Sequence, residues 1–293
     1  MSRVPVISGN GWFQSARYCL QLDDPVEKCQ SVAAVQASLA AGQLQRDEDC
    51  PLEKIGPPGR PERPLLVEPA RVPRRRLGSE EGRAALVHAV AHIEFNAINL
   101  ALDAVYRFRD MPDDYYRDWF SVAADEARHF MMVSARLGEL GYAYGDFPAH
   151  NGLWEMAEKT ADSCLRRMAL VPRVLEARGL DVTPGMIERL QQAGDEVTVG
   201  VLRVILQEEV RHVDIGSRWF RYCCERESLD PEPTFFDLLE RYYGPSIRGP
   251  FNQEARLEAG FSQQEMKRLI GAGGAQHRYG LAEQFAERLK ERS

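Results

Sequence analysis

The sequence predicts an all-α protein, and two observations lead to that prediction. No segment alternates apolar and polar residues over the length of a strand between hairpin turns. Helix-start and helix-stop signals instead bound long segments whose apolar residues recur every three or four positions. We therefore expect an N-terminal helix and proline-rich extended arm at residues 1–79, a bundle of four long helices at 80–228, and a C-terminal helical extension packed on the bundle at 229–293.

The arm begins with a short predicted helix. Asp24 followed by Pro25 is a cap-then-proline start, and Gly42 can end the helix. Prolines then recur between residues 51 and 73, and each one removes a backbone donor and favours an extended predecessor. We expect this stretch to wrap the bundle, because Leu65–Val67 gives it apolar side chains to bury.

The first two bundle helices have clear start signals. Ser79 precedes two glutamates, which is typical of an N-cap with an acidic first turn, and this helix should run to about Arg109. Pro112 opens the second helix, which Gly141 can terminate. Residues 141–153 show no helical period and should form a connection.

The second half of the predicted bundle contains more helix-breaking signals. A third helix is expected at 154–178 with a kink at Pro172, and a separate short helical piece at Thr183. A long fourth helix should follow Asp195 and continue to about Arg226. Further helices are expected in the C-terminal extension, at 233–243, 262–270 and 280–291.

Composition restricts the class of protein. The chain has 293 residues, 44% of them hydrophobic, so it can bury a core without a structural metal. A formal net charge of −7 argues against general nucleic-acid binding. No apolar run approaches the roughly 20 residues that span a bilayer, and no secretory signal is evident. The six cysteines are scattered without a Cys-x-x-Cys pair, which favours reduced thiols and a cytoplasmic protein.

The chemistry is expected at two Glu-x-x-His pairs. Glu126 and His129 share a helix face whose other members are all apolar or aromatic. Glu209 and His212 repeat this pattern. Burying a bare carboxylate is costly, so such a group needs a proton, a partner or a metal. Two inward Glu-x-x-His pairs are the bundle signature of di-iron and di-manganese carboxylate proteins.

That architecture also needs one carboxylate from each of two other helices. Glu94 lies on an apolar face and precedes Glu126 by 32 residues; Glu176 has a less apolar face and precedes Glu209 by 33. The expected metal ligands are therefore Glu94, Glu126, His129, Glu176, Glu209 and His212. Mixed carboxylate and imidazole ligation suits two iron ions, with manganese or a mixed pair as the alternative.

Several assignments stay open at this point. Glu208 rivals Glu209, because it lies four residues before His212 and its face is also apolar. We prefer Glu209, which matches Glu126, and expect Glu208 to support the ligands from behind. Asp125 and Asp214 can orient the ligand histidines, but surface salt bridges are an equal alternative. A buried network of polar side chains without metal is the alternative for the whole set.

Four strings make the sequence recognisable: His92-Ile-Glu94-Phe-Asn-Ala, Asp125-Glu126-Ala-Arg-His129-Phe, Glu176-Ala-Arg-Gly-Leu-Asp181 and Glu208-Glu209-Val-Arg-His212-Val. From about Pro61 to Phe261 the chain resembles a family of ferritin-like proteins that has no assigned reaction. That resemblance implies a ferritin-like four-helix bundle with a metal site. More distantly, the pattern resembles the tRNA hydroxylases of the MiaE type, which are oxygen-dependent di-iron enzymes, and it implies the same six ligands. The acidic chain gives no reason to carry the tRNA substrate over.

The expected function is an O2-dependent di-iron oxidase or hydroxylase. Its expected partners are O2, a small-molecule or modified-nucleoside substrate and an electron-donor protein, with no membrane; a homodimer is left open. The C-terminal residues Arg248, Asn252 and Arg256 are expected either to bind an anionic group or to form a structural loop. The alternatives are a ferroxidase or iron-handling protein, against which the long extensions argue, and a non-catalytic metal-binding bundle.

Overall fold

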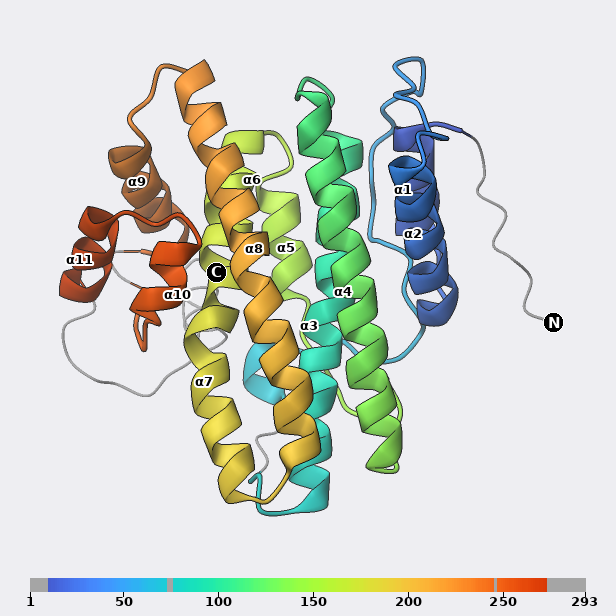
Figure 1. Ribbon diagram of the computed structural model, residues 1–293, viewed down its shortest axis with the longest axis vertical. Helices are drawn as coiled ribbons and strands as arrows, with labels where there is room; N and C mark the ends of the chain where they lie inside the picture. The colour runs from blue at the N-terminus through green and yellow to red at the C-terminus, as the bar shows by residue number, and fades with distance from the viewer. Residues whose placement is uncertain (1–9, 73–75, 245–246, 273–293) are drawn as a thin grey trace. The chain divides into compact units, whose positions relative to one another are not determined.

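The computed structural model describes residues 10–72, 76–244 and 247–272 (Figure 1). In these ranges the regular elements are helices, and the extended pairings are two isolated bridges, Gly11–Gln45 and Leu66–Ala149. The all-α prediction is therefore confirmed for the described residues. The helices in chain order are α1 (Trp12–Gln21), α2 (Pro25–Ala40), the 3-10 turn η1 (Pro69–Arg71), α3 (Glu80–Arg107), α4 (Asp113–Glu139), α5 (Gly152–Lys159), α6 (Cys164–Leu170), the π-helical segment η2 (Val171–Glu176), α7 (Ala177–Gln192), α8 (Glu196–Arg226), α9 (Pro231–Tyr243), α10 (Gln253–Glu258) and α11 (Gln263–Ala272).

Two compact units make up the described chain. The first takes its residues from Met1–Leu66 and Gly78–Ala149, and the second from Val67–Leu77 and His150–Ser293. The first contains the helix pair α3 and α4, and the second contains the pair α7 and α8. Each unit therefore carries one long helix pair and one Glu-x-x-His pair. The three-part division into arm, bundle and extension stays a prediction.

The N-terminal helices belong to the first unit. The Asp24 side chain accepts a hydrogen bond from the Glu27 amide at 2.8 Å, so α2 has the predicted cap. The preceding helix α1 was not predicted, because its N-cap Gly11 offers no side-chain acceptor to read. Phe13 of α1 is buried and meets the Tyr116 ring edge-on, with centroids 5.1 Å apart.

Lys28 of α2 is a buried cation in the first unit. Its ammonium group donates to Leu20 O at 3.0 Å, to Gly59 O at 2.8 Å and to Asn99 Oδ1. These three oxygens match the three donors of an ammonium group. Burial nevertheless lowers the pKa of Lys28 to about 7. One nitrogen thus joins the end of α1, the extended arm and α3.

The arm packs on the first unit mainly through hydrogen bonds that involve its backbone. Tyr106 Oη donates to Pro51 O and accepts from the Glu53 amide, both at 2.9 Å. The Ala149 amide donates to Leu65 O at 3.0 Å. The Leu65 side chain is 66% exposed, so the expectation that it would be buried is wrong. Proline-rich segments leave their carbonyls unpaired, and here those carbonyls rather than the leucines form the attachment.

Helices α3 and α4 form the core pair of the first unit and run side by side (Figure 1). Ser79 Oγ accepts from the Gly82 amide at 3.1 Å, which is the predicted cap of α3. Helix α4 follows Pro112 and ends before Gly141, whose φ is +80°. Helix α3 has a window apolar enough to span a membrane, but 78% of that window is buried, as in the core helix of a soluble protein.

The predicted third helix at 154–178 is wrong in detail. The chain breaks between α5 and α6, where Thr160 Oγ1 donates to Met156 O at 2.7 Å and Ser163 caps α6. Pro172 does not kink one continuous α-helix; it lies in η2, where a π-helical segment accommodates the missing N–H. The helix then continues as α7 with Pro184 inside it, so no separate helix starts at Thr183.

The rest of the second unit follows the predictions more closely. Helices α7 and α8 run side by side, and Asp195 caps α8 by accepting from the Thr198 amide at 3.1 Å. Helices α9 and α11 confirm the predictions at 233–243 and 262–270. Helix α10 was not predicted, and the helix expected at 280–291 lies outside the described residues.

Candidate metal centre

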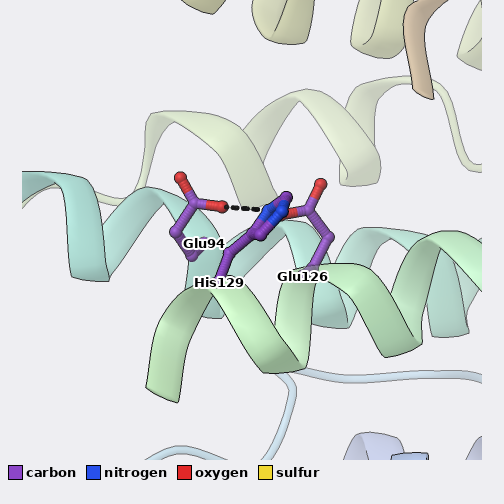
Figure 2. Close-up of side chains that lie close together, drawn as sticks. All are labelled: Glu94, Glu126 and His129. Atoms are coloured by element: carbon purple, nitrogen blue, oxygen red, sulfur yellow. Dashed lines mark ion pairs between the residues drawn. The ribbon is translucent and has the colours of Figure 1, made fainter. Parts of the chain in front are cut away.

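Glu94, Glu126 and His129 come together inside the first unit (Figure 2). Glu94 comes from α3, while the other two lie one turn apart on α4. His129 Nδ1 is 3.3 Å from Glu94 Oε2 and 3.4 Å from Glu126 Oε2. The exposed fractions of Glu94, Glu126 and His129 are 5%, 1% and 0%. The imidazole thus lies between two buried carboxylates.

The apolar faces predicted around these residues produce this burial. The face of Glu94 comprises Val87, Val90, Ala97, Ile98, Ala101 and Val105, and all are buried. The face of Glu126 comprises Trp119, Val122, Ala123, Phe130, Val133 and Leu137, which are buried as well. Packing of these two stripes against each other fixes the register of α3 and α4 and brings the three polar side chains together.

Electrostatics at this cluster favours a bound cation. Burial, and then repulsion from Glu126, raises the pKa of Glu94 well above its ordinary value. Burial alone would lower the pKa of His129, but hydrogen bonds to Glu126 and Glu94 outweigh that effect and raise it to about 10. A proton on His129 therefore offsets part of the negative charge. A metal ion in the same place could do so too.

The donor set fits a metal ion. Each of the three residues offers one ligand atom, and these atoms lie within 4.8 Å of one another. Neighbouring ligands of an ion with bonds of about 2.1 Å lie roughly 3 Å apart, close to the two distances at His129. Two carboxylate oxygens and an imidazole nitrogen form a donor set that iron and manganese accept. A buried polar network uses the same contacts and remains the alternative.

A hydrogen-bonded group of side chains in the same unit includes a tyrosine from the loop after α4. His92 Nδ1 is 2.9 Å from Tyr144 Oη, and Asn96 Nδ2 donates to His92 Nε2 at 3.1 Å. The Tyr144 ring packs against Phe95 and Phe130, which follow Glu94 and His129 in sequence, at 5.6 and 5.1 Å. Tyr144 could not be predicted from the sequence, because the loop that carries it has no periodicity to indicate which side chains are buried.

His88 has a structural role in the same loop contact. His88 Nε2 accepts a hydrogen bond from the Gly145 amide at 2.9 Å, so this nitrogen carries no proton. Burial lowers the pKa of His88 to about 4. His88 is therefore a neutral core histidine that holds the loop after α4.

The second unit brings together two of its three predicted ligands in a direct contact. His212 Nδ1 and Glu209 Oε2 on α8 are 3.2 Å apart, and both residues are buried. Glu176 is buried at the last position of η2, with 8% of its surface exposed. Glu208 is only half-buried, and Val204 on its face is 38% exposed, which favours Glu209 as the ligand. The complete six-ligand set stays a prediction.

The other predicted residues form more ordinary contacts. Asp125 Oδ1 accepts from Arg128 Nη2 at 3.1 Å on the partly exposed side of α4, as the surface alternative expects. Asp214 and Glu208 are half-buried. A role for these residues in orienting histidines stays a prediction.

The C-terminal residues form a docked loop. Arg256 donates to Asp181 through Nε at 2.9 Å and Nη2 at 2.7 Å, and its side chain is 1% exposed. The Asn252 amide donates to Asp181 Oδ1 at 2.9 Å, and Arg248 O accepts from Arg178 Nη1 at 3.3 Å. These contacts favour the structural alternative for Arg256. Anion binding by Arg248 and Asn252 stays a prediction.

Comparison with known proteins adds a family. Residues 21–267 match the family model described as "Protein of unknown function (DUF455)", and this stretch includes both Glu-x-x-His pairs. An uncharacterized protein of Haemophilus influenzae is 45% identical over 267 residues, which cover 87% of this chain and 92% of the relative. No solved structure matches the chain. The chain belongs to the DUF455 family.

Proposed function

We propose that this protein is an O2-dependent di-iron oxidase or hydroxylase acting on an organic substrate. Its fold would be a ferritin-like four-helix bundle, with Glu94, Glu126, His129, Glu176, Glu209 and His212 as the ligand set. The observation that carries the proposal is the buried group Glu94, Glu126 and His129, whose three ligand atoms lie within 4.8 Å of one another.

The second unit supports a two-ion centre rather than a single site. It repeats the order Glu then Glu-x-x-His at a spacing of 33 residues against 32, and its Glu209 and His212 are also buried and in contact. Bundle proteins with two such halves are the di-iron and di-manganese carboxylate proteins. Two iron ions are proposed, with manganese or a mixed pair as the alternative.

The chain's own residues set the conditions for this chemistry. Two ferrous ions held by these residues would supply the electrons for reduction of O2. The apolar stripes around Glu94 and Glu126 keep water away from the carboxylates, which strengthens their attraction for a cation. The proposed substrate is a small molecule or a modified nucleoside, and turnover would require electrons from a donor protein. The six cysteines all lie in the described residues, where they are buried and form no disulfide, which supports a cytoplasmic location.

Anaerobic loading with ferrous iron tests the proposal. The full chain should bind about two ions, and admission of O2 should consume O2 and change the optical spectrum. Glu126→Gln should lose this reaction, whereas Glu139→Gln should retain it, because Glu139 is 60% exposed and pairs with Arg136 on the surface. Iron bound without any O2 consumption contradicts an oxidase. Oxidation of iron by a 24-subunit particle, measured by light scattering, would instead identify an iron-storage protein.

A further inference from the structure

We propose that the C-terminal segment 252–265, which contains α10 and the start of α11, positions the ligand Glu176 by holding the chain on both sides of it. This inference rests on the proposed function, since Glu176 is a ligand only there. Two ion pairs carry the inference, one at Arg173, three residues before Glu176, and one at Asp181, five residues after it. All the residues involved lie in the second unit.

The first ion pair joins η2 to the start of α11. Arg173 Nη2 donates to Glu265 Oε1 at 2.7 Å, and the two side chains are 2% and 7% exposed. The other carboxylate oxygen of Glu265 accepts from the Ser262 amide at 2.7 Å, while Ser262 Oγ accepts from the Glu265 amide at 2.9 Å. This reciprocal pair is a capping box. One carboxylate therefore caps α11 and pairs with the segment that carries Glu176.

Aromatic rings surround the same guanidinium. The Arg173 Cζ atom lies 4.8 Å from the ring centroid of Phe220, 4.3 Å from that of Phe235 and 4.4 Å from that of Phe261. Among the described residues, its Nε and Nη1 atoms have no hydrogen-bond acceptor, and the ring faces lie against the guanidinium instead. Burial lowers the pKa of Arg173, and the Glu265 carboxylate opposes that effect. Loss of Glu265 would leave a buried cation without its carboxylate partner.

The second ion pair joins the start of α7 to α10. Arg256 donates two parallel hydrogen bonds to the Asp181 carboxylate, at 2.9 and 2.7 Å. Asp181 also accepts from the Asn252 amide at 2.9 Å. The Asn252 side chain donates to Leu180 O at 3.2 Å. A fork of this kind fixes direction as well as distance. The first turn of α7 after Glu176 is therefore held from the C-terminal side.

The backbone at Glu176 needs such support. A π-helical segment is less regular than an α-helix, and Pro172 removes one of its donors. Glu176 is the junction residue between η2 and α7, so a small change in η2 moves its carboxylate. Glu94 and Glu126 lie in the interiors of regular helices and have no comparable requirement.

Substitution of the two ion pairs tests the inference in the full-length protein. Glu265→Gln and Arg256→Met should each weaken binding of one of two Mn²⁺ ions by roughly 10- to 100-fold, the usual cost of losing a group that holds a ligand in place. With ⁵⁷Fe²⁺, one of two Mössbauer environments should change and the other should stay. A purely global loss of stability would not select one environment. Backbone amides at 174–178 should exchange with solvent roughly tenfold faster in both variants.

Arg221→Ala is the matched control. Arg221 of α8 donates to Gly260 O at 2.7 Å and so also holds the C-terminal segment, but from a helix that does not carry Glu176. This variant should keep both metal affinities and the exchange rates at 174–178. Wild-type metal affinities in folded Glu265→Gln and Arg256→Met overturn the inference. If the wild type binds no metal, the proposed function fails, and the exchange rates alone decide whether the segment holds Glu176 in place.

Discussion

The two units carry the same order of acidic and histidine residues on differently built supports. In the first unit, Glu94 and the pair Glu126 and His129 lie on two unbroken helices of 28 and 27 residues. In the second unit, Glu176 lies where a π-helical segment meets α7, while Glu209 and His212 lie on one unbroken helix. Equal spacing in sequence therefore does not mean equal local backbone.

The difference extends to what holds each glutamate. Glu94 is fixed by apolar neighbours on its own helix and by His129 at 3.3 Å. The segment around Glu176 is fixed by two ion pairs to residues far along the chain. Arg173 and Glu265 are 92 positions apart, and Asp181 and Arg256 are 75 positions apart. The first half thus depends on local helix structure and the second on distant contacts.

The largest effect is expected from removing a proposed ligand in either unit. Glu126→Gln and Glu209→Gln should each weaken metal binding by more than about 100-fold, because loss of a coordinating carboxylate exceeds the cost of losing a group behind it. Isothermal titration with Mn²⁺ measures this. Glu208→Gln is the matched control, since Glu208 is half-buried beside Glu209. Loss of binding in Glu208→Gln with retention in Glu209→Gln would reverse the assignment on α8.

The substitution Gly216→Ala should lower the stability of the second unit. A Cβ atom there would lie 2.2 Å from Cβ of Pro172, whose rigid ring in η2 cannot move aside alone. Overpacking of this kind costs about 1–3 kcal/mol, and urea unfolding measures it.

Gly179→Ala provides the comparison for that substitution. The nearest atom to its added Cβ is Glu209 Cγ at 3.9 Å, an ordinary contact. Alanine in place of a helical glycine should leave the stability unchanged or raise it by up to about 1 kcal/mol. Equal stabilities of Gly216→Ala and Gly179→Ala would show that η2 and α8 are not tightly packed.

Lys28 should give the first unit a pH-dependent stability. The unfolded lysine keeps its proton to about pH 10.5, but the folded one releases it near pH 7. The unfolded chain then binds more protons, so unfolding free energy should rise from pH 7 to about 8.5 by roughly 1 kcal/mol per pH unit. Above that range Cys19 and Cys29 act oppositely, because burial raises their folded pKa to about 12.

Lys28→Met supplies the reference for that measurement. Urea unfolding of both proteins at several pH values isolates the contribution of this residue, since all other groups are shared. The wild type should gain stability relative to Lys28→Met across this range. Parallel pH profiles for the two proteins would mean that Lys28 stays charged when folded.

The smallest effects are expected at the helix caps. Ser79→Ala in the first unit should cost about 1 kcal/mol, because it removes one acceptor for the Gly82 amide. Asp195→Ala in the second unit should cost more, since buried Asp195 also accepts from Thr198 Oγ1 at 2.8 Å. Thermal unfolding of the two variants tests the order. A larger loss for Ser79→Ala would contradict it.

The sequence predicts what depends on local patterns. The caps at Ser79 and Asp24 and the apolar faces of Glu94 and Glu126 follow from neighbouring residues, and the structure confirms them. The all-α class follows from the same patterns. These features could be read because each depends on side chains within about one or two turns.

Contacts between residues far apart in the chain cannot be predicted from such local patterns. Pro172 suggested a kink, but its π-helical segment and the ion pair of Arg173 with Glu265 depend on a residue far along the chain. The sequence allowed Arg256 to bind an anion, but in the structure Arg256 pairs with Asp181. Tyr144 packs against Phe130 from a loop, where no sequence periodicity indicates which side chains are buried. These are tertiary effects that a local pattern does not contain.

The three hydrogen bonds of Lys28 also bear on the order in which the first unit folds. The bond to Asn99 closes a loop of 71 residues, whereas α3 and α4 are joined by a short connection and can pair early. The arm is then expected to dock late, after α3 presents Asn99. In the native protein, the reverse step should be the easiest opening of this unit, releasing the arm while the α3–α4 pair stays intact.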